Sequence, residues 1–227
     1  MSSGARESRV AVQDYVKAIW SLAEAMPDAS VSTGAIAAEL GVSPPSVSSM
    51  VRRLEADRLI EHEPYRGVRL TDRGRALALE VVRHHRLLET FLARALGMSW
   101  DRVHAEAEIL EHHISEELED LIDKHLGAPE FDPHGHPIPR RDGTIPSLPL
   151  RALVDLDAGD NGVIAQVRDD SADVLQYLER QGLVVGARVD IADVDRIAGT
   201  LTLVLDDAAT CVLGSTLAQR IDLKGIA

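Results

Sequence analysis

Histidines and acidic residues gather in the middle of this 227-residue sequence, in a combination that suits metal binding. Residues 76–146 carry 14 acidic against 7 basic side chains. The same stretch holds eight of the nine histidines, at positions 84, 85, 104, 112, 113, 125, 134 and 136. Imidazole nitrogen and carboxylate oxygen together suit Mn²⁺ and, less selectively, Fe²⁺, Co²⁺ or Zn²⁺. For any single acid–histidine pair, a solvated charged face is the alternative interpretation.

A first predicted helix carries one acid–histidine pair. Thr71 caps this helix, which reaches Leu96 and ends before a glycine. Within it, His85 and Glu89 are four residues apart and therefore lie on one face.

A second predicted helix, capped by Ser99 and running to Leu126, carries more candidates. At about 100° per residue, four side chains fall within one arc of about 100°: His104, Glu108, Glu111 and His112. His113 points away from that arc. If the two helical faces meet, they form one or two metal sites.

The order of the ligands argues against an enzyme. H-x-x-E-H is a metallopeptidase motif, but Glu108 takes its first position here and gives E-x-x-E-H. The sequence also contains no H-E-x-x-H, no Gly-x-Ser-x-Gly and no phosphate-cradling glycine loop. We therefore expect no catalysis and no small-molecule substrate.

The N-terminal third predicts a winged helix-turn-helix. A helical apolar period runs from Val12 to Ala25, and Met26-Pro27-Asp28 ends that helix. A short helix at 34–40 and a helix from Pro44 to about residue 58 then flank a tight glycine turn, the arrangement of a helix-turn-helix. Segments 59–63 and 67–70 flank a Pro-Tyr-Arg turn and predict a β-hairpin, the wing.

The second helix of a helix-turn-helix enters the major groove of DNA, where its first residues meet base edges. Here those positions hold small hydroxyl side chains and a proline, namely Ser43, Pro45, Ser46, Ser48 and Ser49. Three arginines would contact phosphates: Arg52, Arg53 and, in the wing, Arg66. None of the five residues expected to meet base edges is an Arg or Asn. Sequence specificity would therefore depend on DNA shape and apolar contacts. The alternative is that the serines only cap a helix of a structural domain.

The net charge of −13 is unevenly distributed along the sequence. Residues 1–75 hold 10 basic and 10 acidic side chains, whereas residues 147–227 hold 7 and 13. DNA-binding domains usually present basic surface. The N-terminal third is thus the only third that would not repel a phosphate backbone.

The cysteine count and the absence of long apolar runs indicate where in the cell the protein is expected. A single cysteine, Cys211, excludes a disulfide framework and a cysteine-based zinc ribbon. No apolar run approaches the ~20 residues of a membrane span, and no apolar segment follows the N-terminus as in a signal peptide. We expect a cytoplasmic protein with no membrane partner.

The last third predicts a small β-rich domain. The segment 129–149 is rich in Pro, Gly, Asp and His and is typical of a linker or an ordered loop. Strands follow at 162–167, 188–192 and 200–205, with one helix near 171–181, as in a small β-barrel. The predicted domains are 1–75 for DNA binding, 76–146 for dimerisation and metal binding with the Pro-rich linker, and 147–227 for the barrel.

Segments along the whole chain resemble the diphtheria toxin repressor family of metal-activated transcriptional repressors. The matching segments are VQDYVKAIW, VSTGAIAAELGVSPPSVSSMVRRLEADRLIEH, LTDRGRALALEVVRHHRLLETFL, VHAEAEILEHHISEELE and DPHGHPIP. The resemblance implies a mainly α fold with little β: a winged helix-turn-helix, a helical dimerisation domain and a C-terminal SH3-like (FeoA-like) β-barrel. It also implies a homodimer that binds double-stranded operator DNA.

The resemblance further implies two metal sites. By position, the primary site would use Asp14, Glu108, Glu111 and His112. The ancillary site would use His85, Glu89 and His104, completed by Asp170 or Asp173 from the SH3-like domain. In some relatives the Pro-rich loop supplies a ligand instead, which implicates Asp132 and His134.

The ligand types indicate the manganese transport regulators within this family. In the iron-responsive branch, the positions of Asp14 and Glu108 are Met and Cys. Hard carboxylate oxygens favour Mn²⁺ and remove the preference for sulfur-binding metals. One departure is Lys17, where some manganese regulators have a glutamate, so their closely spaced binuclear site is not implied. The alternatives are an Fe²⁺-dependent repressor and a metal-binding interaction module that does not bind DNA.

Overall fold

The computed structural model describes residues 3–25, 30–205 and 209–226. Its contacts divide the chain into two compact units. Unit 1 comprises residues 1–84, 111–114 and 139–144, and unit 2 comprises 85–110, 115–138 and 145–227. The long helix α4, Asp72–Leu96, contributes its first half to unit 1 and its second half to unit 2.

Unit 1 opens with a helix-turn-helix. Helix α1 spans Ser3–Ala25 and so begins earlier than the predicted Val12, while the predicted helix end at 26–28 lies outside the described residues. Helices α2, Thr33–Glu39, and α3, Pro44–Ala56, follow as predicted. The Ser43 hydroxyl caps α3 by accepting a hydrogen bond from the Ser46 amide at 3.3 Å.

The wing is an antiparallel pair of strands, β1 (Ile60–Glu63) and β2 (Gly67–Leu70). This confirms the predicted hairpin. Gly67 has φ +113°, and a Cβ there would lie 2.4 Å from the Val31 carbonyl oxygen, so only glycine fits this approach. Buried apolar side chains of α1, α2 and α3, including Ile19, Ile36 and Leu54, form the core of this part.

The prediction of one helix from residue 99 to 126 was wrong. The structure has two helices, α5 (Trp100–Leu110) and α6 (Glu116–Leu126), with a turn between them. Ser115 caps α6 by accepting from the Leu118 amide at 3.2 Å, and acidic residues in the first turn suit the helix N-terminus. The helical period continues through the break, which is why periodicity alone missed it.

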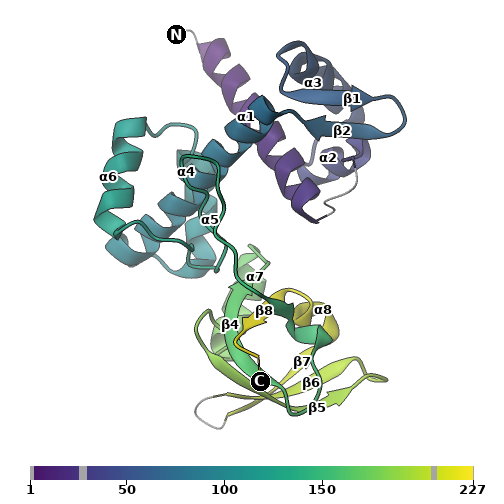
Figure 1. Cartoon of the computed structure of the whole chain (residues 1–227), viewed down its shortest axis with the longest axis vertical. Coiled ribbons are helices and arrows are strands. Elements are labelled where there is room, and N and C mark those ends of the chain that lie inside the picture. The colour runs from purple at the N-terminus through teal and green to yellow at the C-terminus, as the bar shows by residue number, and fades with distance from the viewer. Residues whose placement is uncertain (1–2, 26–29, 206–208, 227) are drawn as a thin grey trace. The chain divides into compact units, whose positions relative to one another are not determined.

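The C-terminal part of unit 2 is a six-stranded sheet in the order β3-β8-β4-β5-β6-β7, with every pair antiparallel (Figure 1). The strands are β3 (Arg151–Ala152), β4 (Asn161–Val167), β5 (Arg188–Asp195), β6 (Thr200–Leu205), β7 (Thr210–Gly214) and β8 (Ile221–Lys224). The helical elements are η1 (Leu153–Asp155), α7 (Ala172–Arg180) and α8 (Ser215–Ala218). The predicted strands and helix are confirmed, and β3, β7, β8, η1 and α8 were missed.

Part of the Pro-rich segment is an ordered loop that packs on β4. The amide of Val167 donates to the carbonyl of His134 at 2.8 Å. Gly135, at φ +85°, lies so close to β4 that a Cβ would be 1.9 Å from the Ala165 oxygen. The contact falls where β4 has an irregular register between Ile164 and Gln166. The loop therefore belongs to the fold of unit 2.

Candidate metal centres and DNA-reading surface

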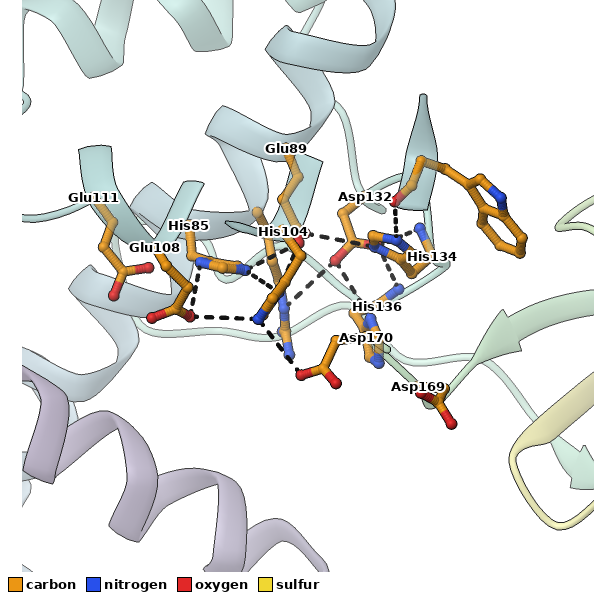
Figure 2. Close-up of polar contacts among 12 residues, drawn as sticks. His85, Glu89, His104, Glu108, Glu111, Asp132, His134, His136, Asp169 and Asp170 are labelled. Carbon is orange, nitrogen blue, oxygen red and sulfur yellow. Dashed lines mark hydrogen bonds and ion pairs between the residues drawn. The ribbon is translucent and has the colours of Figure 1, made fainter. Parts of the chain in front are cut away.

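The first cluster of candidate ligands lies in unit 2, between α4 and α5. The Nε2 atom of His85 is 2.9 Å from Glu89 Oε1 and 3.1 Å from His104 Nδ1. His104 Nδ1 is 3.3 Å from the same Glu89 oxygen. Figure 2 shows these three side chains pointing toward one another. We call this set, with Glu108, the His85 cluster.

The spacing of these three atoms fits a divalent metal ion. Two ligand atoms held at right angles at about 2.1 Å from one ion lie about 3.0 Å apart. The three separations in the His85 cluster are 2.9, 3.1 and 3.3 Å. His85 and Glu89 are 6% and 2% exposed, so the protein has removed both from water at this place.

Two further carboxylates reach the same imidazoles. Glu108 Oε1 lies 3.5 Å from His85 Nδ1 and 3.8 Å from His104 Nε2. Asp170 Oδ2 lies 3.4 Å from His104 Nε2, also within unit 2 (Figure 2). The structure therefore places Glu108, a predicted primary ligand, beside predicted ancillary ligands. Asp173 is exposed on α7, and no contact with this cluster is found among the described residues.

Glu89 stays ionised despite its burial. Burial alone would raise the pKa of this carboxyl, but His85, His104 and His134 together hold it well below its usual range. Burial would likewise lower the pKa of His134, yet the Glu89 carboxylate raises it. The cluster is thus built around one buried negative charge that imidazoles stabilise.

The Pro-rich loop brings a second group of donors beside the first. His134 Nε2 donates to the Trp100 carbonyl at 2.8 Å, which leaves Nδ1 facing Glu89 Oε2 at 3.8 Å. Asp132 Oδ1 accepts from the backbone amides of His134 and His136 at 2.8 and 2.9 Å. Its other oxygen is buried, has no hydrogen-bond partner among the described residues, and lies 3.4 Å from His136 Nδ1.

Sequence reasoning included Asp132 and His134 in this loop but missed His136. The motif D-P-H-G-H offers a signal for it, because Asp132, His134 and His136 alternate along the loop. One atom from each of the three lies within 4.8 Å of the others. Arg86 Nε is 3.8 Å from Asp132 Oδ2, and its positive charge disfavours a cation at that oxygen.

The third cluster lies in unit 1 and joins α1 to the turn between α5 and α6. His112 Nε2 is 2.9 Å from Asp14 Oδ1 and 3.4 Å from Glu111 Oε1. We call Asp14, Glu111 and His112 the Asp14 cluster. Asp14 is nearly a hundred positions from Glu111 and His112 in sequence. The one-helix prediction grouped Glu111 with His112 for the wrong reason, because these two residues are neighbours in a turn, with His113 exposed beside them.

A buried amide orients the histidine of the Asp14 cluster. Gln13 is 2% exposed, and its Oε1 accepts a hydrogen bond from His112 Nδ1 at 3.0 Å. The proton on Nδ1 leaves the lone pair on Nε2, the atom that faces both carboxylates. Such an outer hydrogen bond is the usual support of a metal-binding histidine. Gln13 was missed from the sequence because glutamine is not itself a ligand type.

The candidate DNA-reading surface lies at the start of α3 and on the wing, also in unit 1. The hydroxyls of Ser43 and Ser46 bond to each other at 2.8 Å, and Ser48 donates to the Pro44 carbonyl at 3.0 Å. Pro45 and Ser49 are exposed, and no hydrogen bond of the Ser49 hydroxyl is found in the described part of the chain. Ser43, Ser46 and Ser48 therefore also stabilise the helix, while Pro45 and Ser49 are exposed at positions predicted to meet a base.

Arginines lie further along α3, on the wing and in a cleft beside α3. Arg52 is exposed, while Arg53 and Arg66 make exposed ion pairs, with Asp57 at 3.8 Å and Glu63 at 3.3 Å. A cleft of about 410 Å³ runs beside Arg53, and Arg9 of α1 and Arg73 of α4 also line it. Sequence reasoning did not single out these last two arginines, because nothing in their spacing relates them to α3.

Family models match the chain in three consecutive pieces. "Iron dependent repressor, N-terminal DNA binding domain" matches residues 10–68. "Iron dependent repressor, metal binding and dimerisation domain" matches residues 71–140, and "FeoA domain" matches residues 151–224.

The names of individual relatives refer to two different metals, iron and manganese. The iron-dependent repressor IdeR of Mycobacterium leprae is 32% identical over 203 residues, covering 84% of this chain and 87% of the relative. The HTH-type transcriptional regulator MntR of Geobacillus kaustophilus is 40% identical over 104 residues, covering 46% and 72%. A solved manganese-dependent transcriptional repressor in complex with manganese has a TM-score of 0.85 at 41% identity, covering 93% of this chain and 98% of that one.

A winged helix-turn-helix combined with histidine–carboxylate clusters and a FeoA domain defines a metal-dependent, DNA-binding transcriptional repressor. The chain belongs to the diphtheria toxin repressor family, as the sequence resemblance predicted. The expected fold class is confirmed, and the family consists of transcriptional regulators, not enzymes. Among the described residues, no helix is long and apolar enough to cross a membrane.

Proposed function

We propose that this protein is a manganese-activated repressor of genes for metal uptake, and that it binds operator DNA as a homodimer. The observation that carries the proposal is the Asp14 cluster, in which two carboxylates and an oriented imidazole converge. Its oxygen-rich donor set favours Mn²⁺, and it contains no sulfur. The 41% identity to a manganese-dependent repressor supports the same choice.

The proposed activation depends on where the ligands stand in the chain. Asp14 is on α1 of the winged-helix part, whereas Glu111 and His112 follow α5. When bound, the metal ion would supply a positive charge that all three side chains share. Their common coordination would link α1 to the turn before α6. This link would limit the movement of the winged-helix part, which carries the DNA-reading helix α3. Two readers must sit about 34–36 Å apart, or a multiple, to enter successive major grooves.

The proposed ancillary site uses the His85 cluster, with Asp170 as its SH3-like ligand. His85, Glu89 and His104 would hold the ion, and Asp132 and His134 of the loop are neighbouring candidates. We assign its role as coupling the loop and the FeoA sheet to α4. The division into domains 1–75, 76–146 and 147–227 is likewise part of this proposal.

The second copy has a candidate contact surface in unit 2. Leu96, Ile109, Leu110, Leu118 and Leu121 are large apolar side chains that are 37–63% exposed in the single chain. Apolar side chains that are exposed in the single chain are candidates for burial against a second copy. The family match to a dimerisation domain at residues 71–140 includes all five positions.

A binding titration tests the proposal. Affinity for an operator-bearing DNA fragment should be measured in parallel with Mn²⁺, Fe²⁺ and Zn²⁺, and again after chelation. We expect submillimolar Mn²⁺ to switch on binding and the chelator to abolish it. Equal affinity with and without metal would contradict the proposal.

Two alternatives give different results in the same titration. An iron-dependent repressor, favoured by the 32% identity to an iron-dependent relative, would respond to Fe²⁺ at lower concentration than to Mn²⁺. A metal-binding interaction module would take up metal without any salt-dependent affinity for DNA.

A further inference from the structure

The Asp14 cluster contains a cation supplied by the protein itself. Lys17 Nζ lies 2.8 Å from Glu111 Oε2 and 3.0 Å from Glu111 Oε1. The Glu111 side chain is 0% exposed and that of Lys17 is 17% exposed. A two-point contact with a buried carboxylate is a strong ion pair, because little water competes for either charge.

Lys17 and His112 both lie close to the same oxygen atom of Glu111. Glu111 Oε1 is 3.0 Å from the Lys17 ammonium and 3.4 Å from His112 Nε2. A protonated amine has three donors and no lone pair, so it cannot join a metal's coordination shell. A divalent ion bound through Glu111 would therefore face a positive charge at hydrogen-bond distance from its own ligand.

The position of Lys17 follows from the helix. Asp14 and Lys17 are three residues apart on α1, so both side chains project from the same face toward the turn that carries Glu111 and His112. Asp14 meets His112 and Lys17 meets Glu111. The same helical face thus presents one ligand and one competitor to the two residues of that turn.

We propose that Lys17 is an internal competitor for Glu111, and that its displacement sets the metal concentration at which the Asp14 cluster fills. This inference rests on the proposed function, because it takes the cluster to be the metal site. The lysine pair keeps the buried carboxylate neutralised without metal, and it makes binding an exchange of one cation for another. If the paired form holds about nine-tenths of the molecules, apparent affinity is weakened about tenfold.

The exchange also explains why a carboxylate this deeply buried is tolerated. An unpaired buried charge is strongly destabilising. Without an ion, Lys17 pairs with Glu111, and with an ion bound, the ion takes its place as the partner of Glu111. The chain therefore need not depend on metal to fold, which suits a regulator that must persist in metal-poor conditions.

Direct metal binding tests the proposal without reference to DNA. The free Mn²⁺ concentration should be followed by electron paramagnetic resonance as wild type, Lys17→Gln and Lys124→Gln are titrated. Lys124 is an exposed lysine on α6, so its replacement removes the same charge outside the cluster. We expect Lys17→Gln to bind Mn²⁺ about tenfold more tightly than wild type, and Lys124→Gln to stay within about twofold.

The outcomes separate the two proposals. If wild type binds no Mn²⁺, the proposed function fails. If wild type binds Mn²⁺ but Lys17→Gln binds it equally or more weakly, Mn²⁺ binding by the chain stands and the competitor role is overturned, because Lys17 would then only position Glu111.

A second measurement needs no substitution and covers the case in which Lys17→Gln does not fold. The chain has three lysines, at positions 17, 124 and 224, so their side-chain ¹⁵N resonances are readily distinguished. The protein would be titrated with diamagnetic Cd²⁺, and calorimetry would measure how much Cd²⁺ is bound at each step. As the bound fraction rises, we expect the Lys17 resonance to move toward the resonances of the exposed Lys124 and Lys224. A Lys17 resonance that stays unchanged while Cd²⁺ binds would overturn the proposal.

Discussion

We expect individual donor atoms to determine which metal ion the protein prefers. Asp14 and Glu108 each offer carboxylate oxygen, whereas the family resemblance implies Met and Cys at these positions in the iron-responsive members. Oxygen donors suit hard ions such as Mn²⁺, and sulfur donors suit softer ones. In the structure, Asp14 lies against His112, and Glu108 lies against His85 and His104. The two substitutions would thus alter two different clusters.

The double variant Asp14→Met, Glu108→Cys should change which metal activates the protein. We expect the concentration of Fe²⁺ or Co²⁺ needed for DNA binding to fall relative to that of Mn²⁺ by about tenfold, or 1.4 kcal/mol. Parallel operator titrations with the three metals measure this ratio, and each single variant serves as a control for its own cluster. An unchanged ratio would remove the donor argument for manganese.

The orientation of His112 depends on one residue that is not a ligand. Replacing Gln13 by Met keeps the volume but removes the acceptor of the Nδ1 proton, so the imidazole is free to take the other tautomer. We expect Mn²⁺ affinity to fall about 10–100-fold, measured by competition with a metal-binding dye. Gln13→Glu keeps an acceptor and is the matched control; equal losses in both variants would count against orientation as the cause.

At the scale of elements, the Pro-rich loop links the donors of α4 to the FeoA sheet within unit 2. His134 donates to a backbone carbonyl at the start of α5 and accepts from Val167 of β4. Asp132 holds the loop's shape through two backbone amides. The position of His134 beside Glu89 therefore depends on the loop's packing on β4.

Gly135→Ala should break this packing. The new Cβ would lie 1.9 Å from the Ala165 oxygen, in a φ region that side chains disfavour. We expect a loss of about 3 kcal/mol or more in the free energy of unfolding, measured by urea denaturation. Gly159→Ala is the matched control, because Gly159 also has positive φ but nothing lies within 4 Å of its Cβ position. It should cost about 1 kcal/mol, and equal losses would contradict the loop-packing argument.

For the molecule as a whole, the charge distribution matters more than the total of −13. The neutral residues 1–75 contain the reader and its arginines, while the acidic residues 76–227 contain the candidate ligands for metal, except Asp14. Binding of divalent cations would neutralise part of that acidity and reduce repulsion from DNA. Net charge alone would have argued against the function that the family membership shows.

Arg53→Gln should weaken DNA binding without changing its sequence preference. A phosphate contact carries no base information, so we expect a uniform loss and a fall of about 1 in the slope of log affinity against log salt. The measurement is operator and non-operator binding across a salt series in saturating Mn²⁺. Arg180→Gln removes an exposed charge from α7 and is the control. A loss confined to the operator would indicate base reading by Arg53 instead.

The local elements and the chemical types of the ligands could be predicted from the sequence alone. Caps at Ser43 and Thr71, a short glycine turn and alternating strands predict most helices and strands, because those signals act over a few residues. Tertiary structure decided what distant residues do together. In the folded chain, the predicted helix ends before Glu111, and Glu108 lies beside His85. Gln13 and Lys17 contact the two residues that follow α5. Contacts between residues nearly a hundred positions apart depend on packing, which no local pattern encodes.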